Sequence, residues 1–265
     1  MAPDDPRRAE VLEAMAELYL RLNGFFCIRN YLQHRPDPDD FGLYTESDLL
    51  AMRMPNQEEV LENGRHQKND LGLVLPKGKA LVDCVIAEVK EPSVEFNKPI
   101  RGVDGPRRIA EALRMFGVFP EECFAQDGVA EKVAHELHEK VNQSIWAEHP
   151  TAHRPEHGVS VRMVVFAPET AKHSKERKHF DLQWVLDFTR NRMRSGEPCA
   201  AYRSLDVPSA SPWRGCTRLI VEVLDKNHAL DEADLRLGRF IEEVLALWDT
   251  RILAWSSQLQ SKTPA

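Results

Sequence analysis

The stretch Leu81-Val-Asp-Cys-Val-Ile-Ala-Glu-Val-Lys90 contains seven apolar or cysteine residues in ten and ends in two charges. Such a run is typical of a central β-strand that is covered on both faces of its sheet. Because side chains two positions apart in a strand point the same way, Glu88 and Lys90 share a face, with Cα atoms about 6–7 Å apart. Buried charges are costly unless they are paired, hydrogen-bonded or bound to a metal. A carboxylate and an amine at the end of a core strand therefore indicate chemistry.

The segments on either side of this strand alternate between helical and extended patterns, which predicts an α/β protein. Helices are expected at residues 8–22, 106–116, 128–146, 180–194 and 231–255. Strands are expected at residues 25–32, 43–54, 81–90, 159–167 and 217–224. The polar residues 54–80 form an insertion between two of these strands. A domain boundary at 149–158 is one alternative, but a single domain is more economical because strand 159–167 can join the first sheet.

The overall composition is that of a soluble globular protein, with 42% apolar and 29% charged residues in a chain of 265. The net charge of −7 argues against a generally basic surface, although a local basic patch remains compatible with nucleic-acid binding. The five cysteines are widely spread, with no C-x-x-C pair, which indicates reduced thiols. No apolar signal core or membrane-spanning run is present, so we expect a cytoplasmic protein without a membrane partner.

The acidic candidate on strand 43–54 is Asp48. If Asp48 lies beside Glu88 on a neighbouring strand, two carboxylates and Lys90 converge on one point. Two carboxylates suit a hard cation such as Mg²⁺, which keeps several of its waters. A bound metal of this kind activates water and neutralises charge that develops on a phosphate, and a nearby lysine assists both effects.

The order Asp48 … Glu88-Val89-Lys90, after an amphipathic helix, resembles the PD-(D/E)XK nuclease superfamily, which has the restriction endonuclease-like fold. The opening Ala16-Glu-Leu-Tyr-Leu-Arg-Leu-Asn-Gly-Phe25, followed by Glu46-Ser-Asp-Leu-Leu50, looks closest to the Holliday junction resolvase-like branch. The resemblance covers roughly residues 8–117 and extends to strand 159–167.

This resemblance implies an α-β-β-β-α-β core, with a central mixed sheet flanked by helices, within residues 1–170. Residues 171–265 would add helices and a strand packed on the same domain. The implied activity is metal-dependent hydrolysis of phosphodiester bonds in DNA. Asp48 and Glu88 would bind Mg²⁺ or Mn²⁺, and Lys90 would orient or activate the attacking water. A glutamate on the first helix often completes the site in this branch, and Glu17 fits better than Glu13 because it lies nearer the helix end.

The sequence departs from the family pattern in two respects. Ser47 stands where many members have proline, and the separation of Asp48 from Glu88 is long, so that part of 54–80 must be looped out. This leaves Asp70 or Asp83 as rivals to Asp48. Asp83 ranks lower because it has the wrong parity to share a face with Glu88.

Six basic residues are candidate phosphate contacts for a nucleic-acid partner, DNA or alternatively RNA: Arg101, Arg107, Arg108, Lys172, Lys175 and Lys178. A homodimer is compatible with the paired sites that many nucleases use. His135 and His138 are three residues apart, so the zinc-helix spacing H-E-x-x-H is absent. Two other functions stay open: a catalytically silent nuclease-fold protein that binds nucleic acid or a protein partner, and a protein in which Glu88 and Lys90 form a purely structural pair.

Overall fold

The structure is a computed structural model that describes residues 5–33, 45–54, 59–60, 66–67, 70, 73, 82–194, 212–227 and 235–260. Its strands are β1 (Phe26–Gln33), β2 (Thr45–Arg53), β3 (Glu59–Val60), β4 (His66–Gln67), β5 (Val82–Val89), β6 (Thr151–Arg154), β7 (Val159–Ala167) and β8 (Phe180–Asp181). Its α-helices are α1 (Pro6–Leu22), α2 (Lys98–Arg101), α3 (Gly105–Phe116), α4 (Val129–Val141), α5 (Leu182–Arg194), α7 (Pro212–Lys226) and α8 (Leu237–Gln260). Short 3₁₀ turns lie at Glu121–Phe124 and Pro155–His157.

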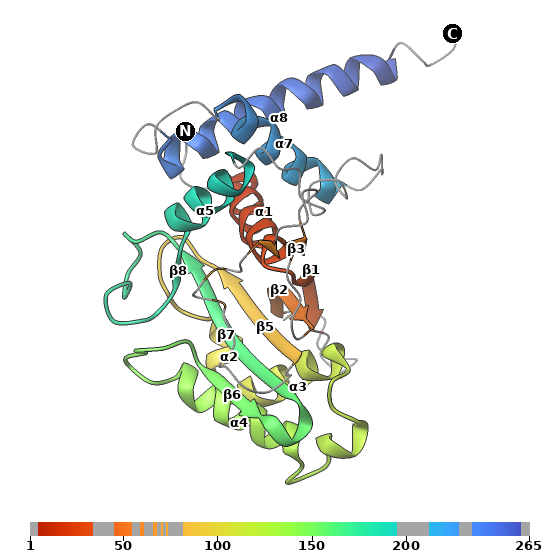
Figure 1. Ribbon diagram of the computed structural model, residues 1–265, viewed down its shortest axis with the longest axis vertical. Coiled ribbons are helices and arrows are strands. Elements are labelled where there is room, and N and C mark those ends of the chain that lie inside the picture. Colours follow the sequence, from red (N-terminus) through yellow and green to blue (C-terminus); the bar gives the residue numbers. More distant parts are fainter. Residues whose placement is uncertain are drawn as a thin grey trace.

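Within these residues, a mixed sheet of six strands lies at the centre, with helices on both faces (Figure 1). Strands β1, β2 and β5 are successive antiparallel neighbours, and β5 pairs in parallel with β7. The crossover from β5 to β7 contains α2, α3 and α4, as a parallel connection requires. β6 runs antiparallel to the first half of β7, and β8 runs parallel to its end.

The alternation of side chains along the strands divides the apolar core into two layers. Leu49, Val85 and Ala87 face α1, α5, α7 and α8, and they share one cluster with the buried residues of those helices. Leu50 and Ile86 face the other way and pack with α2, α3 and α4. Since each strand is covered on both sides, a continuous apolar run such as that of β5 is what the sheet needs.

Helix α1 begins and ends where its sequence provides the signals. The Asp5 side chain accepts a hydrogen bond from the backbone N–H of Arg7, and Pro6 occupies the first turn, where its missing N–H costs nothing. The helix ends at Asn23-Gly24, and Gly24 has a φ of 83°, a left-handed conformation that glycine adopts readily. This turn directs the chain into β1.

The prediction of a strand at 217–224 is wrong, because these residues lie within helix α7. The β-branched residues suggested a strand, but the buried positions Cys216, Leu219, Ile220, Val223 and Leu224 recur at the helical period. They pack in the same cluster as α1 and α8. Tertiary packing therefore overrides a weak local preference.

The segment 149–158, considered as a possible boundary, contains strand β6, which pairs with β7 in the main sheet. Only Ala152 of its four residues is buried, so this short edge strand has little apolar pattern to reveal it. The other predicted helices and strands are confirmed, with ends shifted by up to about six residues.

Most of the predicted insertion 54–80 falls outside the described residues. The described part of it includes the antiparallel pair of β3 and β4, which is separate from the main sheet. Within the described chain, none of the helices combines the length and apolar character needed to cross a bilayer.

Candidate active site

Glu88 and Lys90 lie at the end of β5, on the face of the sheet that carries α2, α3 and α4. Lys90 Nζ is 2.7 Å from Glu88 Oε2. The Glu88 side chain is fully buried, whereas that of Lys90 is 22% exposed. The two residues therefore form an ion pair in which Lys90 is the more exposed partner.

Asp48 joins this pair from β2. The antiparallel register pairs Leu49 with Ala87, so Asp48, which precedes Leu49, lies beside Glu88, which follows Ala87. The Oδ2 atom of Asp48 accepts a 2.6 Å hydrogen bond from the backbone N–H of Val89 and lies 3.5 Å from Lys90 Nζ. The structure thus brings together Asp48, Glu88 and Lys90, as the sequence predicted. We call them the Asp48–Glu88–Lys90 cluster.

The charges of the cluster keep its lysine protonated. Burial opposes the charged form of the Lys90 ammonium, but the charges of Glu88 and Asp48, together with their hydrogen bonds to it, outweigh burial and raise the pKa of Lys90 above its ordinary value. Lys90 is therefore a cation at neutral pH. Two carboxylates and one ammonium leave the cluster with a net negative formal charge.

The carboxylates of the cluster are the type of ligand that a hard cation binds. Water and substrate oxygens would have to supply the other ligands of such a cation. Both contacts of Asp48 within the described structure use Oδ2, which leaves Oδ1 available to a cation. No group of three or more histidine, cysteine, aspartate or glutamate side chains that could hold a metal ion occurs in the described part of the chain. Mg²⁺ is commonly held by one or two carboxylates together with waters and phosphate oxygens, so Asp48 and Glu88 fit this ion without forming a closed cage.

Glu17, the fourth predicted member, does not join the cluster. It lies on α1, which packs against the opposite face of the sheet. Its carboxylate is 2.6 Å from Arg21 Nη2 and 3.6 Å from Arg29 Nε. Glu17 therefore contacts two arginines on its own side of the sheet, and the cluster itself contains two carboxylates.

The rival aspartates lie in a different polar network on the α1 side of the sheet. Asp83 is fully buried, with Oδ2 3.0 Å from Arg53 Nη2 and Oδ1 3.1 Å from Arg162 Nε. Asp70 accepts a 3.0 Å hydrogen bond from the Trp184 indole N–H. Both aspartates thus pair with groups of the protein, which leaves Asp48 as the acidic partner of Glu88.

Of the three arginines that the sequence offered as phosphate contacts, one is buried and two form ion pairs within the protein. Arg108 is buried in α3 with 9% exposure. Arg101 pairs with Glu95 at 3.3 Å, and Arg107 lies 3.5 Å from Glu111. The predicted lysines, Lys172, Lys175 and Lys178, are exposed.

The sequence and the fold were compared with those of known proteins. No family model, curated protein or solved structure matches the chain. The description of the candidate site therefore depends on the geometry of the Asp48–Glu88–Lys90 cluster alone.

Sequence reasoning missed an ion pair between α1 and the residue that follows the cluster. Glu91 follows Lys90 directly, and both of its carboxylate oxygens accept a 2.8 Å hydrogen bond from Nε of Arg8 in the first turn of α1. The position of Glu91 beside the E-x-K sequence was visible, but its partner 83 residues away was not. This ion pair links α1 to the residue that follows Lys90.

A cavity of about 660 Å³ lies elsewhere, beside α4, with Phe124, Lys132 and His135 in its lining. No residue of the Asp48–Glu88–Lys90 cluster lines it. His138, the other histidine of that helix, has Nε2 2.9 Å from the carbonyl oxygen of Gly102, a structural contact between α4 and the α2–α3 turn.

Proposed function

We propose that this protein is a metal-dependent nuclease that hydrolyses phosphodiester bonds in DNA, with the Asp48–Glu88–Lys90 cluster as its active site. The observation that carries the proposal is the convergence of two carboxylates and a protonated lysine at the end of the core strand β5. An ion pair kept only for stability does not need the second carboxylate, Asp48, which a backbone N–H holds in place.

The order of the elements supports the same proposal. Apart from the β3–β4 pair between β2 and β5 and the edge strand β6 before β7, the chain order is a helix, three antiparallel strands, a helical crossover and a strand parallel to the third: α1, β1, β2, β5, α2–α4 and β7. This order agrees with the α-β-β-β-α-β core that the family resemblance implies. A cytoplasmic location fits the free thiols of Cys27, Cys84, Cys123 and Cys216.

Each residue of the cluster has a distinct part in the proposed reaction. Asp48 and Glu88 would hold Mg²⁺ or Mn²⁺, which would supply activation of water and neutralisation of charge on the phosphate. The Val89 N–H orients the Asp48 carboxylate through Oδ2. Lys90, kept cationic by its neighbours, orients the attacking water and stabilises negative charge on the phosphate oxygens.

The test is incubation with supercoiled, linear, branched and single-stranded DNA, and with RNA, in the presence of Mg²⁺ or Mn²⁺. We expect Asp48→Asn, Glu88→Gln and Lys90→Met each to lower cleavage about a hundredfold or more while the circular dichroism spectrum is unchanged. Glu136→Gln is the matched control, since Glu136 forms an ion pair with Lys140 at the same 2.7 Å distance on α4.

Cleavage that persists in Glu88→Gln would contradict the proposal. A folded wild type that binds nucleic acid without cutting any substrate would favour the alternative, a catalytically silent nuclease-fold protein. If nothing is bound or cut and Glu88→Gln unfolds, the cluster is a structural ion pair.

A further inference from the structure

The loop between β7 and β8, residues 168–179, carries three exposed lysines with no ion-pair partner among the described residues: Lys172, Lys175 and Lys178. Neighbouring basic side chains are engaged: Arg177 lies 3.4 Å from Glu95, and His173 lies 2.7 Å from Glu176. We call residues 168–179 the lysine loop.

One end of the lysine loop is hydrogen-bonded to the segment that leaves the candidate active site. The Lys90 N–H donates to Phe166 O at 2.8 Å, the Lys172 N–H to Pro92 O at 3.2 Å, and the Val94 N–H to Lys172 O at 2.9 Å. Lys172 thus forms a parallel bridge with Ser93, which lies shortly after Lys90 in the chain. With at most about 3.3 Å of chain per residue from Lys90 to Ser93 and about 4.8 Å across the bridge, the backbone of Lys172 lies within about 15 Å of that of Lys90.

The other end of the loop is hydrogen-bonded to Trp146. The Trp146 N–H donates to Glu176 O at 3.0 Å, and the Lys178 N–H donates to Trp146 O at 2.9 Å. The Arg177 guanidinium lies over the Trp146 ring, 4.8 Å from its centre. Because backbone hydrogen bonds hold both ends, the loop presents its lysines from a defined position.

We propose that the lysine loop is a phosphate-binding arm that holds the backbone of a nucleic-acid strand as it enters the Asp48–Glu88–Lys90 cluster. At a rise of about 3.4 Å per nucleotide, a separation of at most about 15 Å places Lys172 within about five nucleotides of the bond at the cluster. Lysine is a flexible point charge, so the arm selects the phosphate backbone and not a base sequence. This inference rests on the proposed function for the position of the cleaved bond, and its test separates the two.

The experiment measures binding of a labelled oligonucleotide duplex in the absence of divalent metal, over a range of salt concentrations. The variant replaces all three lysines: Lys172→Gln, Lys175→Gln and Lys178→Gln. We expect its affinity to be lower by roughly tenfold or more, and the slope of log affinity against log salt to fall by about 0.9 for each phosphate that the variant no longer neutralises. In cleavage, KM should rise while kcat changes little, since the arm holds substrate away from the reacting atoms.

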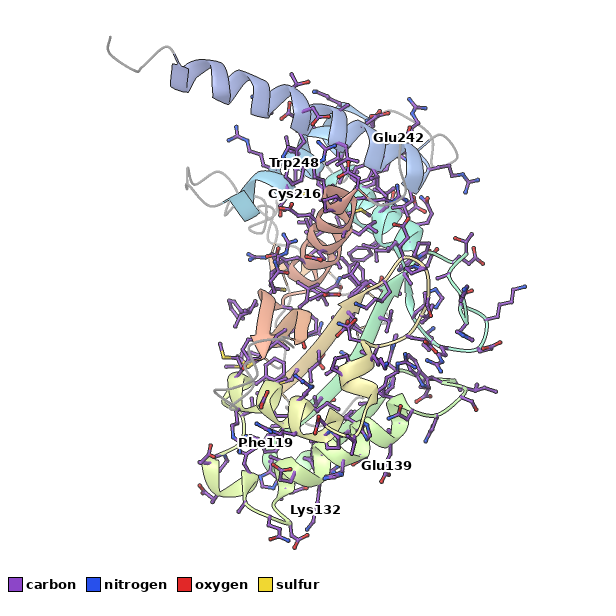
Figure 2. All side chains as sticks on the ribbon, turned by 180° about the vertical axis from the view of Figure 1, so that it is seen from behind. Phe119, Lys132, Glu139, Cys216, Glu242 and Trp248 are labelled. Atoms are coloured by element: carbon purple, nitrogen blue, oxygen red, sulfur yellow. The ribbon has the colours of Figure 1, made fainter. Side chains whose placement is uncertain are left out.

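Lys132→Gln is the control, because Lys132 is also exposed and lies on α4 at the end of the molecule opposite α8 (Figure 2). It should leave affinity and salt slope unchanged. If the triple variant and the wild type have equal affinity and equal salt dependence, the proposal that the lysine loop binds phosphates is overturned, even if the wild type cuts DNA. If the wild type binds without cutting and the triple variant does not bind, the arm stands and the nuclease proposal fails. A wild type that neither binds nor cuts the duplex overturns both.

Discussion

At the residue scale, buried ionisable groups divide into those with partners and those kept neutral. Asp83 is enclosed by Arg53 and Arg162, so its buried charge is compensated. His149 is different: its ring stacks on Phe180 with centroids 4.7 Å apart, and neither ring nitrogen has a hydrogen-bond partner in the described structure. Burial, followed by the nearby positive charges of Arg162, Lys178 and His179, lowers the pKa of His149 from 6.5 to about 3.

His149 is therefore expected to make the protein acid-sensitive. Below pH 6.5 the unfolded chain binds a proton that the folded protein does not bind until about pH 3, so the free energy of unfolding falls as the pH is lowered through that window. The loss amounts to about 1.4 kcal/mol per pH unit. His149→Phe should preserve the stacking and gain about 2 kcal/mol relative to wild type at pH 5, with little change at pH 7.5. Urea unfolding at both pH values measures this, and an equal effect at both would show that titration of His149 is not the cause.

At the element scale, the first residue of α3, Gly105, has no space for a side chain because atoms of neighbouring residues lie close to it. A Cβ atom at Gly105 would lie 2.1 Å from the carbonyl oxygen of Ile100 and 2.3 Å from Cδ2 of His138. Gly105 therefore lets α2, α3 and α4 meet. These helices cover the face of the sheet that carries the Asp48–Glu88–Lys90 cluster.

Gly105→Ala is expected to lower the free energy of unfolding by about 1–3 kcal/mol, because backbone and ring atoms must move apart. The matched control is Gly238→Ala in α8, where nothing lies within 4 Å of the added Cβ. That change should be neutral or stabilise the protein by no more than about 1 kcal/mol. Chemical denaturation of both variants gives the comparison, and equal stability of Gly105→Ala and wild type would disprove the crowding.

At the scale of the whole molecule, the C-terminal helices are part of the main core. Phe240, Ile241, Val244 and Leu245 of α8 are buried in the same cluster as α1 and the β2–β5–β7 face. Helix α7 packs against both α1 and α8, which Figure 1 shows above the sheet. The helices after β8 therefore complete the cover of α1.

A chain that ends at Asn227 is expected to lose its cooperative unfolding transition, because it lacks these four apolar side chains of α8 and exposes the surface that they cover. Each contributes about 1.5–3 kcal/mol when buried, and their sum is comparable with the whole stability of an ordinary domain. Thermal unfolding followed by circular dichroism is the measurement, with a chain that ends at Gln260 as the control. An unchanged transition in the shorter chain would mean that the C-terminal helices form a separable unit.

Local sequence determined most of the elements and two residues of the candidate site. The apolar run before Glu88 predicted a core strand, and the parity of a strand placed Glu88 and Lys90 on one face, because both follow from backbone geometry alone. The helix over 217–224 was missed because its β-branched residues are compatible with either structure until α1 and α8 provide a surface to pack on. β6 was missed because an edge strand buries too little to leave an apolar pattern.

Tertiary structure alone decided the remaining features. It placed Asp48, and not Asp70, beside Glu88, since only the register of β2 on β5 determines which carboxylate lies there. It separated Glu17 from the cluster, because the face against which α1 packs is a property of the whole sheet. It also brought Lys172 next to the segment that follows Lys90. The sequence by itself determines periodicity and the chemistry of each side chain, whereas contacts between distant segments arise only when the packed core brings them together.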